Sequence, residues 1–281
     1  MKRVFISNIK CHKKNRSAFS DLCFLIKKIT VVIVLLLLIN LTYAQDMKKF
    51  RFGLKAAPNV SWLKPDNTRF EAKRDANKPA LKFSYGLITE FGLTENYSFA
   101  TGLSITTVGG SLNFPDSVYY IAGTAPDTIF LLNRRIYHLQ YVDIPLTIKM
   151  RTNEIGYIKY FGQFGLNLAF KTKARSDDRG VFTDNTFRPG NDVDRPDRLD
   201  VSDETQLFRV ALDLGAGIEY NLVGNTALLV SVNYSNGFTN ALRKNSKVII
   251  DKDKVDAGMV DTRLEQKVTS NYVALNIGIL F

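Results

Sequence analysis

The stretch Phe208–Asn221, FRVALDLGAGIEYN, decides the fold class. Its alternate positions are apolar: Phe208, Val210, Leu212, Leu214, Ala216, Ile218 and Tyr220. The residues between them are small, polar or charged: Arg209, Ala211, Asp213, Gly215, Gly217, Glu219 and Asn221. A period of two residues indicates a β-strand, because successive side chains of a strand point to opposite faces of the sheet. We therefore predict a strand with one apolar face and one small, polar face.

Seven further stretches alternate in the same way, at residues 50–57, 83–92, 97–106, 141–150, 158–171, 228–235 and 272–281. In a soluble barrel or sandwich the second face would meet water and carry many charges. Here it is mostly Gly, Ala, Ser and Asn, which suits a narrow lumen, while the apolar face suits lipid. The sequence predicts an all-β fold, an eight-stranded antiparallel transmembrane β-barrel of the outer membrane. A soluble barrel or sandwich is the alternative.

The connections between these stretches differ in length. Three are short: Thr94–Asn96, Arg151–Gly156 and Leu222–Asn225. Four are long and polar: Ser61–Pro79, Gly109–Asn133, Thr172–Glu204 and Asn236–Gln266. Short turns at one end and long loops at the other are typical of outer-membrane barrels, with the turns in the periplasm. We therefore expect four long extracellular loops and location in the cell outer membrane.

The first 44 residues resemble a secretory signal peptide. Lys27 and Lys28 precede an apolar run at 29–41, and small residues precede Gln45. The run of 13 residues is shorter than the roughly 20 that a membrane-spanning helix needs. The expected organisation is a signal peptide at 1–44 and an outer-membrane β-barrel at 45–281.

Charge and cysteine content support that division. The chain of 281 residues has a net charge of +11, and residues 1–44 contain eight basic residues and one acidic residue. Most of the positive charge therefore belongs to the leader, and no nucleic-acid partner is expected. Both cysteines, Cys11 and Cys23, also lie in the leader, so we expect no disulfide in the mature chain.

Four segments carry a resemblance to a known family. YVDIPLTIK at 141–149 resembles a characteristic segment of the PorT-like outer-membrane β-barrel proteins, and FGLKAAPNV at 52–60 is similar to that family's first strand. FGQFGLN at 161–167 and LGAGIEY at 214–220 are similar to its fifth and sixth strands. The resemblance implies an outer-membrane barrel that assists type IX secretion or gliding machinery, and it brings no catalytic motif.

The inward faces of the predicted strands carry eight charges that we expect to form a lumenal network: Arg51, Glu90, Asp143, Lys149, Lys159, Arg209, Asp213 and Glu219. An unpaired charge in a narrow lumen is unfavourable, so these groups should neutralise one another. The last strand ends in an alternating apolar pattern that resembles the insertion signal of outer-membrane barrels: Val273, Leu275, Ile277, Ile279 and Phe281.

Two features of the sequence are candidate sites of chemistry. His138 could act as the base of a lipid-modifying enzyme, but Gln140 stands where a nucleophilic hydroxyl would be needed. The connection 172–204 is rich in carboxylates, but arginines are interleaved with them and no calcium-loop spacing occurs. We therefore expect no catalytic residue, no metal site and no cofactor.

The sequence thus predicts a non-enzymatic barrel with a structural or interaction role. A porin-like channel for small solutes and a lipid-modifying enzyme at His138 are the alternatives. The expected partners are outer-membrane lipid and lipopolysaccharide, the barrel-assembly machinery and, through the resemblance, secretion-system components. Eight strands leave a lumen just wide enough for side chains, which disfavours the channel.

Overall fold

The computed structural model describes residues 50–66, 76, 78–121, 128–183, 189–222, 224, 226–251, 258, 261 and 263–281. The predicted signal peptide lies outside these residues. Lys48–Phe281 forms one compact unit of the chain. Among the described residues, no helix is both long enough and apolar enough to cross a membrane.

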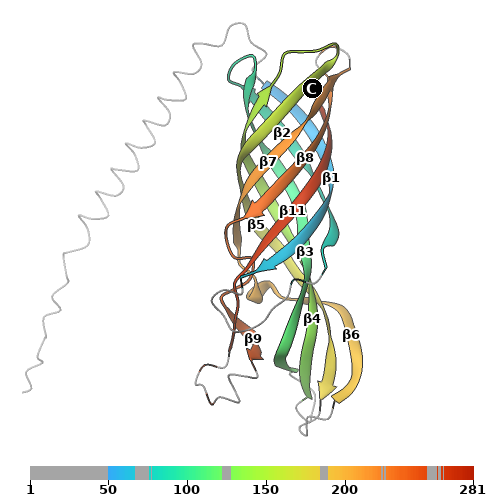
Figure 1. Cartoon of the computed structure of the whole chain (residues 1–281), viewed down its shortest axis with the longest axis vertical. Coiled ribbons are helices and arrows are strands. Elements are labelled where there is room, and N and C mark those ends of the chain that lie inside the picture. Colours follow the sequence, from blue (N-terminus) through green and yellow to red (C-terminus); the bar gives the residue numbers. More distant parts are fainter. Residues whose placement is uncertain are drawn as a thin grey trace, which may run out of the picture. The chain divides into compact units, whose positions relative to one another are not determined.

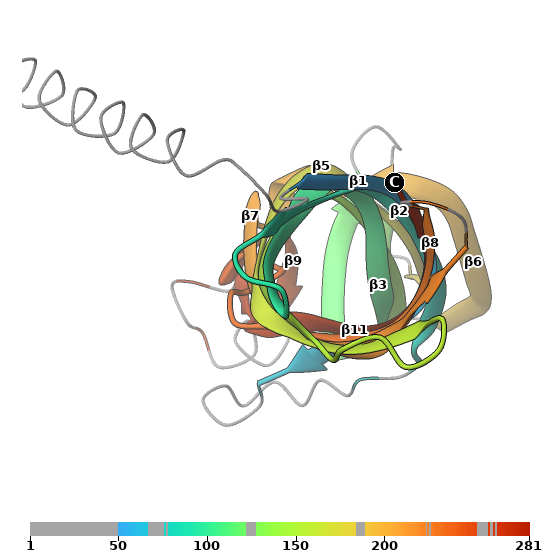
Figure 2. The ribbon, with the colours of Figure 1, turned by 90° about the horizontal axis from the view of Figure 1, so that it is seen from above.

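Eight antiparallel strands form a closed ring (Figures 1 and 2). They are β1 (Phe50–Pro65), β2 (Ala80–Gly92), β3 (Tyr97–Ile121), β4 (Thr128–Arg151), β5 (Ile158–Thr183), β7 (Phe208–Asn221), β8 (Ala227–Gly237) and β11 (Val268–Leu280). Each strand pairs with the next, and β1 pairs with β11, so no edge of the ring is left open. The predicted all-β, eight-stranded antiparallel barrel is confirmed.

The outer wall of the barrel is apolar and the inner face is polar. On β11 the side chains of Val273, Leu275, Ile277 and Ile279 are 38–47% exposed, while Ala274 and Asn276 between them are buried. The outward band on β5 runs from Tyr160 to Phe170. Ten residues of a strand tilted by about 40° cover about 25 Å along the membrane normal, which matches the apolar band of an outer-membrane barrel.

Three of the eight strands are much longer than the membrane requires. Beyond the band, β3, β4 and β5 continue as an outer sheet, and β6 (Pro189–Asp200) folds back on β5 (Figure 1). The predicted loops Gly109–Asn133 and Thr172–Glu204 are therefore wrong as loops, since most of their described residues are paired strand. The predicted loop Asn236–Gln266 likewise contains β9 (Asn245–Asp251) and β10 (Arg263–Glu265).

These segments are mispredicted as loops because backbone pairing between neighbouring strands, and not an alternating apolar pattern in the sequence, forms the outer parts of the strands. Their residues are polar and charged, and Arg135, Asp178 and Arg179 stand among them without a continuous apolar face. The barrel already holds β3, β4 and β5 side by side. Continuing their backbone hydrogen bonds beyond the apolar band therefore costs little additional conformational entropy. A short 3-10 helix, η1 (Ser202–Glu204), then leads back to β7.

Candidate functional site

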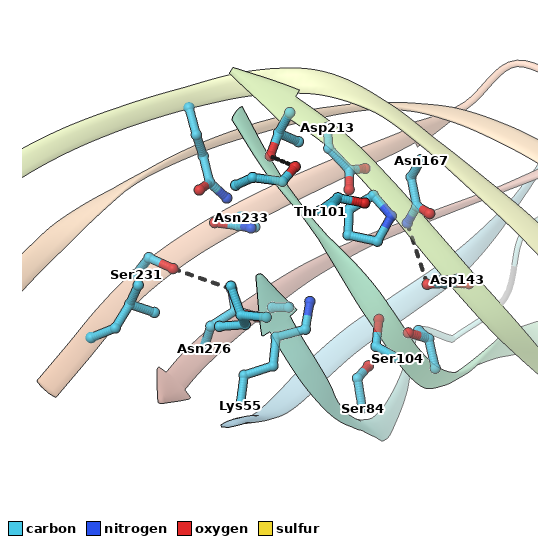
Figure 3. Close-up of a pocket in the computed structure, with 18 of the residues that line it drawn as sticks. Lys55, Ser84, Thr101, Ser104, Asp143, Asn167, Asp213, Ser231, Asn233 and Asn276 are labelled. Atoms are coloured by element: carbon cyan, nitrogen blue, oxygen red, sulfur yellow. Dashed lines mark hydrogen bonds between the residues drawn. The ribbon is translucent and has the colours of Figure 1, made fainter. Parts of the chain in front are cut away.

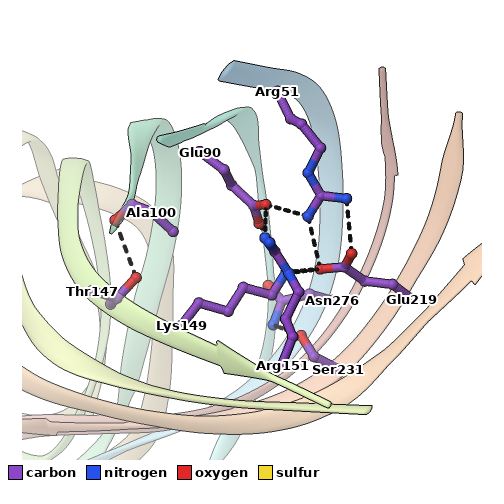
Figure 4. A network of polar contacts seen from close by, with 9 residues as sticks. All are labelled: Arg51, Glu90, Ala100, Thr147, Lys149, Arg151, Glu219, Ser231 and Asn276. Atoms are coloured by element: carbon purple, nitrogen blue, oxygen red, sulfur yellow. Dashed lines mark hydrogen bonds and ion pairs between the residues drawn. The ribbon is translucent and has the colours of Figure 1, made fainter. Parts of the chain in front are cut away.

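The lumen is the candidate functional site, and side chains close it at the end that carries the short turns. Arg51 on β1, Glu90 on β2, Lys149 and Arg151 on β4, and Glu219 on β7 meet there (Figure 4). These five residues are called the ionic cluster below.

The two carboxylates of the ionic cluster each contact all three cations. Arg51 donates to Glu219 Oε2 from Nη1 at 2.9 Å and to Glu90 Oε2 from Nη2 at 2.5 Å. Lys149 Nζ lies 2.8 Å from Glu90 Oε1 and also contacts Glu219. Arg151 Nε lies 3.0 Å from Glu219 Oε1, and its Nη2 contacts Glu90. Neither carboxylate depends on a single partner, so the cluster is a network and not a set of isolated pairs.

The low exposure of these side chains shows that the ionic cluster lies inside the lumen and closes it, and is not a patch on the surface. The side chains of Lys149 and Glu219 are 0% exposed and that of Glu90 is 2% exposed, whereas Arg151 and Arg51 are 11% and 21% exposed. Lys149 Nζ also lies 3.8 Å from the centroid of the Phe161 ring, a cation–π contact. Long charged side chains from four strands of the barrel thus extend into the narrow lumen and fill it at this end.

The structure brings together four of the eight predicted network residues in this cluster: Arg51, Glu90, Lys149 and Glu219. The sequence pattern places Arg151 in a short connection and so does not predict its role, although Arg151 shares the inward parity of Lys149 at the end of β4.

Lys159 does not join the cluster, and that part of the prediction is wrong. Its Nζ pairs with Glu154 Oε2 at 3.3 Å in the turn outside the barrel, with both side chains about one-third exposed. The Asn221 side chain and Lys159 hold the pKa of the Glu154 carboxyl below its usual value. Lys159 is the second residue of β5, so its long side chain reaches the turn more easily than the lumen.

A second polar layer lies deeper in the lumen and contains the other three predicted residues, Asp143, Arg209 and Asp213. Arg209 donates from Nε to Ser270 Oγ at 2.8 Å and from Nη2 to Ser235 Oγ at 3.0 Å, and it lies over the Tyr272 ring. Asp143 accepts from Asn167 Nδ2 at 3.3 Å. Arg209 is therefore satisfied mainly by neutral oxygens.

Between the ionic cluster and this layer lies a small polar cavity of about 70 Å³ (Figure 3). Lys55, another inward cation that the sequence reasoning left out, lines it beside Asp143 and Asp213. Four buried oxygens among the residues that line this cavity have no protein donor: Oδ1 of Asp143, Asn167, Asp213 and Asn233. Buried polar atoms of this kind are usually satisfied by water, and the cavity has room for a few molecules.

The other end of the lumen is closed by backbone. β3 approaches β1 at Gly109 and Gly110: Gly109 N donates to Ser61 Oγ at 2.9 Å. A Cβ atom on Gly110 would lie 3.0 Å from Leu63 N, so a larger residue would force β3 and β1 apart. Asn59 Nδ2 donates to Thr107 O at 3.3 Å on the same side.

Apolar side chains complete this closure, which is called the apolar cap below. Each of its members is at most 1% exposed: Leu63, Val108, Leu112, Phe114, Phe130, Leu132, Leu139, Leu242, Ile249 and Leu264. They come from β1, β3, β4, the segment before β9, β9 itself and β10. Glu204 of η1 anchors β9 to this cap, because its carboxylate accepts hydrogen bonds from Ser246 Oγ at 2.5 Å and from Lys247 N at 2.6 Å.

His138 lies on the outer sheet, away from the ionic cluster. Its Nδ1 lies 2.5 Å from Lys82 Nζ, and its Nε2 lies 3.0 Å from Asp177 Oδ2. Both ring nitrogens are therefore engaged. The neighbouring Asp178 forms a bidentate pair with Arg135, with both distances 2.6 Å.

The carboxylates of the segment 172–204 serve as pairing and capping groups where the structure describes them. Besides Asp177, Asp178 and Glu204, Asp200 accepts from Ser202 N at 2.8 Å. Hydrogen bonds from the Ser202 hydroxyl and from its backbone N–H hold the pKa of the Asp200 carboxyl below its usual value. Among the described residues, no group of three or more His, Cys, Asp or Glu side chains is placed to hold a metal ion.

The residues of the predicted insertion signal lie on one outward face at the end of the chain. Val273, Leu275, Ile277 and Ile279 face out from β11, and Phe281 is 52% exposed beyond it. Phe281 N donates to Phe52 O at 2.7 Å, which ties the chain end to β1. Their role in insertion stays a prediction.

The sequence matches the family described as "Outer membrane protein beta-barrel domain" over residues 43–243, more than half of the chain. The chain belongs to this family. The protein is therefore located in the outer membrane, and by the convention of such barrels its short turns face the periplasm and its outer sheet faces outward. The ionic cluster closes the periplasmic end of the lumen, and the apolar cap closes the outer end.

Several solved outer-membrane proteins have a similar fold. Ail, the attachment invasion locus protein of Yersinia pestis, is 14% identical with a TM-score of 0.38, and the match covers 84% of this chain and 100% of Ail. OprG of Pseudomonas aeruginosa is 10% identical with a TM-score of 0.43, covering 83% of this chain and 96% of OprG. Neisserial surface protein A is 12% identical with a TM-score of 0.37, covering 82% and 95%. No curated protein sequence matches the chain.

Proposed function

We propose that this protein is a non-enzymatic outer-membrane barrel whose lumen is closed and whose outer sheet binds partners. The observation that carries the proposal is the outer sheet itself. β3, β4 and β5 are 25, 24 and 26 residues long, whereas β8 is 11 residues long. Strands that only had to cross the membrane would need about 9–11 residues.

The resemblance to PorT-like proteins gives the partner class. In this proposal the outer sheet and the periplasmic turns contact components of a type IX secretion or gliding machinery, and a signal peptide at 1–44 directs export. The barrel-assembly machinery recognises the C-terminal apolar pattern from Val273 to Phe281. These assignments extend the family membership and rest on the segments quoted from 52–60, 141–149, 161–167 and 214–220.

The geometry disfavours the two alternatives. A solute channel needs an open lumen, but this one is filled by charged side chains at one end and by apolar side chains at the other. An enzyme centred on His138 needs a ring nitrogen that can accept a proton from a nucleophile. Lys82 and Asp177 engage both nitrogens of His138.

Site-specific photo-cross-linking in intact cells tests the proposal. A photoreactive residue is placed at Ile136 or Arg179 on the outer sheet and, as matched controls, at Leu166 or Leu214 on the lipid-facing wall. The outer-sheet positions should cross-link to envelope proteins that mass spectrometry identifies as secretion components, and the wall positions to lipid. Absence of protein adducts at both outer-sheet positions would contradict the interaction role.

A further inference from the structure

A group of cations stands directly above the apolar band on one side of the barrel. Lys171, Lys173 and Arg175 follow one another on β5, and Arg243 lies near Lys171 in the segment that crosses from β8 toward β9. These four residues are called the basic cluster below. Lys173, Arg175 and Arg243 are exposed, and Lys171 is partly exposed.

Below the basic cluster lies an exposed apolar patch. Its members are Phe170, Leu207, Phe208 and Phe238, which are 45%, 64%, 39% and 56% exposed. The rings of Phe170 and Phe208 lie 5.2 Å apart, and Lys171 N donates to Leu207 O at 2.8 Å. The patch and the cluster are therefore joined by adjacent residues of the chain.

The spacing places the cluster at the level of lipid headgroups. Lys173 and Arg175 are three and five residues beyond Phe170 on β5. At about 3.3 Å per residue and a tilt of about 40°, they stand about 8 and 13 Å above the top of the apolar band. In a lipid bilayer this is the headgroup region, where phosphates lie.

Two acids, Asp200 and Asp203, lie near the basic cluster, and Asp200 is the register partner of Arg175. Asp203 pairs with Lys247 at 3.4 Å, and Asp200 accepts from Ser202 N at 2.8 Å. Lys171 Nζ donates to three neutral oxygens, Ser202 O at 2.7 Å, Thr205 O at 3.0 Å and Thr205 Oγ1 at 2.8 Å. Arg243 N donates to Glu204 O at 2.8 Å, one residue before Thr205, so Arg243 and Lys171 are held on neighbouring parts of the same segment. The four cations of the basic cluster outnumber these two acids, so the group keeps a net positive charge that an external anion would compensate.

We propose that the basic cluster and the apolar patch bind a phosphorylated outer-leaflet lipid, with its phosphate on Lys173, Arg175 and Arg243 and its acyl chains against Phe170 and Phe208. Cations alone would fit any anion. The contiguous patch of apolar side chains selects an anion that carries hydrocarbon chains. The inference deepens the proposed function by naming a partner, and it rests on that function only through the location in the outer membrane.

A lipid-binding titration of the full chain, folded in neutral detergent micelles, tests the inference. Bis-phosphorylated lipid A, the same lipid without its phosphates, and inorganic phosphate are titrated separately, with native mass spectrometry as the readout. The phosphorylated lipid should bind, and the other two probes should bind far more weakly. Equal binding of the dephosphorylated lipid would overturn the role of the cations. Equal occupancy by inorganic phosphate would show that free phosphate, not a lipid, is the ligand.

Two sets of variants sharpen the titration. The triple variant Lys173→Gln, Arg175→Gln, Arg243→Gln should weaken binding of the phosphorylated lipid about tenfold to hundredfold, as expected for three cations at a headgroup surface. The variant Lys173→Arg, Arg175→Lys, Arg243→Lys keeps the charges and should retain binding.

The matched control removes three charges elsewhere on the exposed surface, by Lys64→Gln, Lys78→Gln and Arg263→Gln, and should bind like wild type. Heat-modifiable migration on gels checks that every variant is a folded barrel. Unchanged binding by the Gln triple variant, or equal loss in the control, would overturn the inference. Either result would leave the cross-linking test of the proposed function unaffected.

Discussion

The two ends of the lumen are closed by different means. At the periplasmic end, five charged side chains from β1, β2, β4 and β7 reach across the opening (Figure 4). At the outer end, β3 approaches β1 and the segments around β9, β10 and η1 cover an apolar core. The first closure uses side chains alone, and the second uses additional backbone.

The lengths of the connections between strands at the two ends explain the difference. The periplasmic turns are short, for example the four residues between β2 and β3, so no segment is available to fold over the opening. The opening can therefore be closed only by side chains of the barrel strands, and Arg, Lys and Glu side chains are long enough to meet at the barrel axis. At the outer end the long connections provide backbone and apolar side chains, which can exclude water without charge pairing.

The largest expected effect is at the ionic cluster. Glu219→Gln leaves Arg51, Lys149 and Arg151 with one carboxylate in place of two. Breaking such a buried network should lower the free energy of unfolding by about 3–5 kcal/mol. Urea unfolding in lipid vesicles, followed by tryptophan fluorescence, measures the loss. A variant as stable as wild type would mean that the lumen is hydrated and the charges are already solvated.

A smaller loss is expected at the apolar cap. Leu112→Ala removes a fully buried side chain of the apolar cap. The cavity it leaves should lower stability by about 2–4 kcal/mol. Because the cap lies outside the membrane, limited proteolysis should detect local opening of residues 241–251 before the barrel unfolds. Cleavage no faster than in wild type would show that Leu112 does not hold the cap closed.

A double-mutant cycle separates the pair Glu90 and Lys149 from the rest of the cluster. Glu90→Leu leaves Lys149 with Glu219, and adding Lys149→Met restores the original excess of one cation over the carboxylates in the cluster. The double variant should recover much of the loss, with a coupling energy of about 1–3 kcal/mol. Additive losses would mean that each side chain contributes by packing and not by charge.

The smallest effect is expected at Lys159. Its partner Glu154 is exposed in a turn, so Lys159→Gln should leave the unfolding midpoint unchanged, as is usual for a surface ion pair. This variant is the control for Glu219→Gln, since Lys159 and Glu219 are register partners on β5 and β7. Destabilisation as large as that of Glu219→Gln would place Lys159 in the lumenal network after all.

The contrast between the two ends also shows what the sequence could predict. Strand parity predicted that Arg51, Glu90, Lys149 and Glu219 would face inward near one end, because alternation is a local property. The apolar cap was not predicted, since Leu112, Leu242 and Ile249 lie in stretches without alternation and come together only through tertiary pairing. Arg151 was missed through a strand boundary placed one residue early, and Lys159 was misplaced because parity does not tell how far a side chain reaches.

The most direct test of the closed lumen is the steady conductance of the purified protein in planar bilayers, with an open porin as the positive control. Because two closures lie in series, the wild type should show no steady current. Variants trimmed at one end alone, by Glu219→Gln or by Leu112→Ala, should also stay silent while the other end remains shut. A steady, ohmic current from the wild type would contradict the closed lumen, and a current from either variant would show that one of the two closures does not seal.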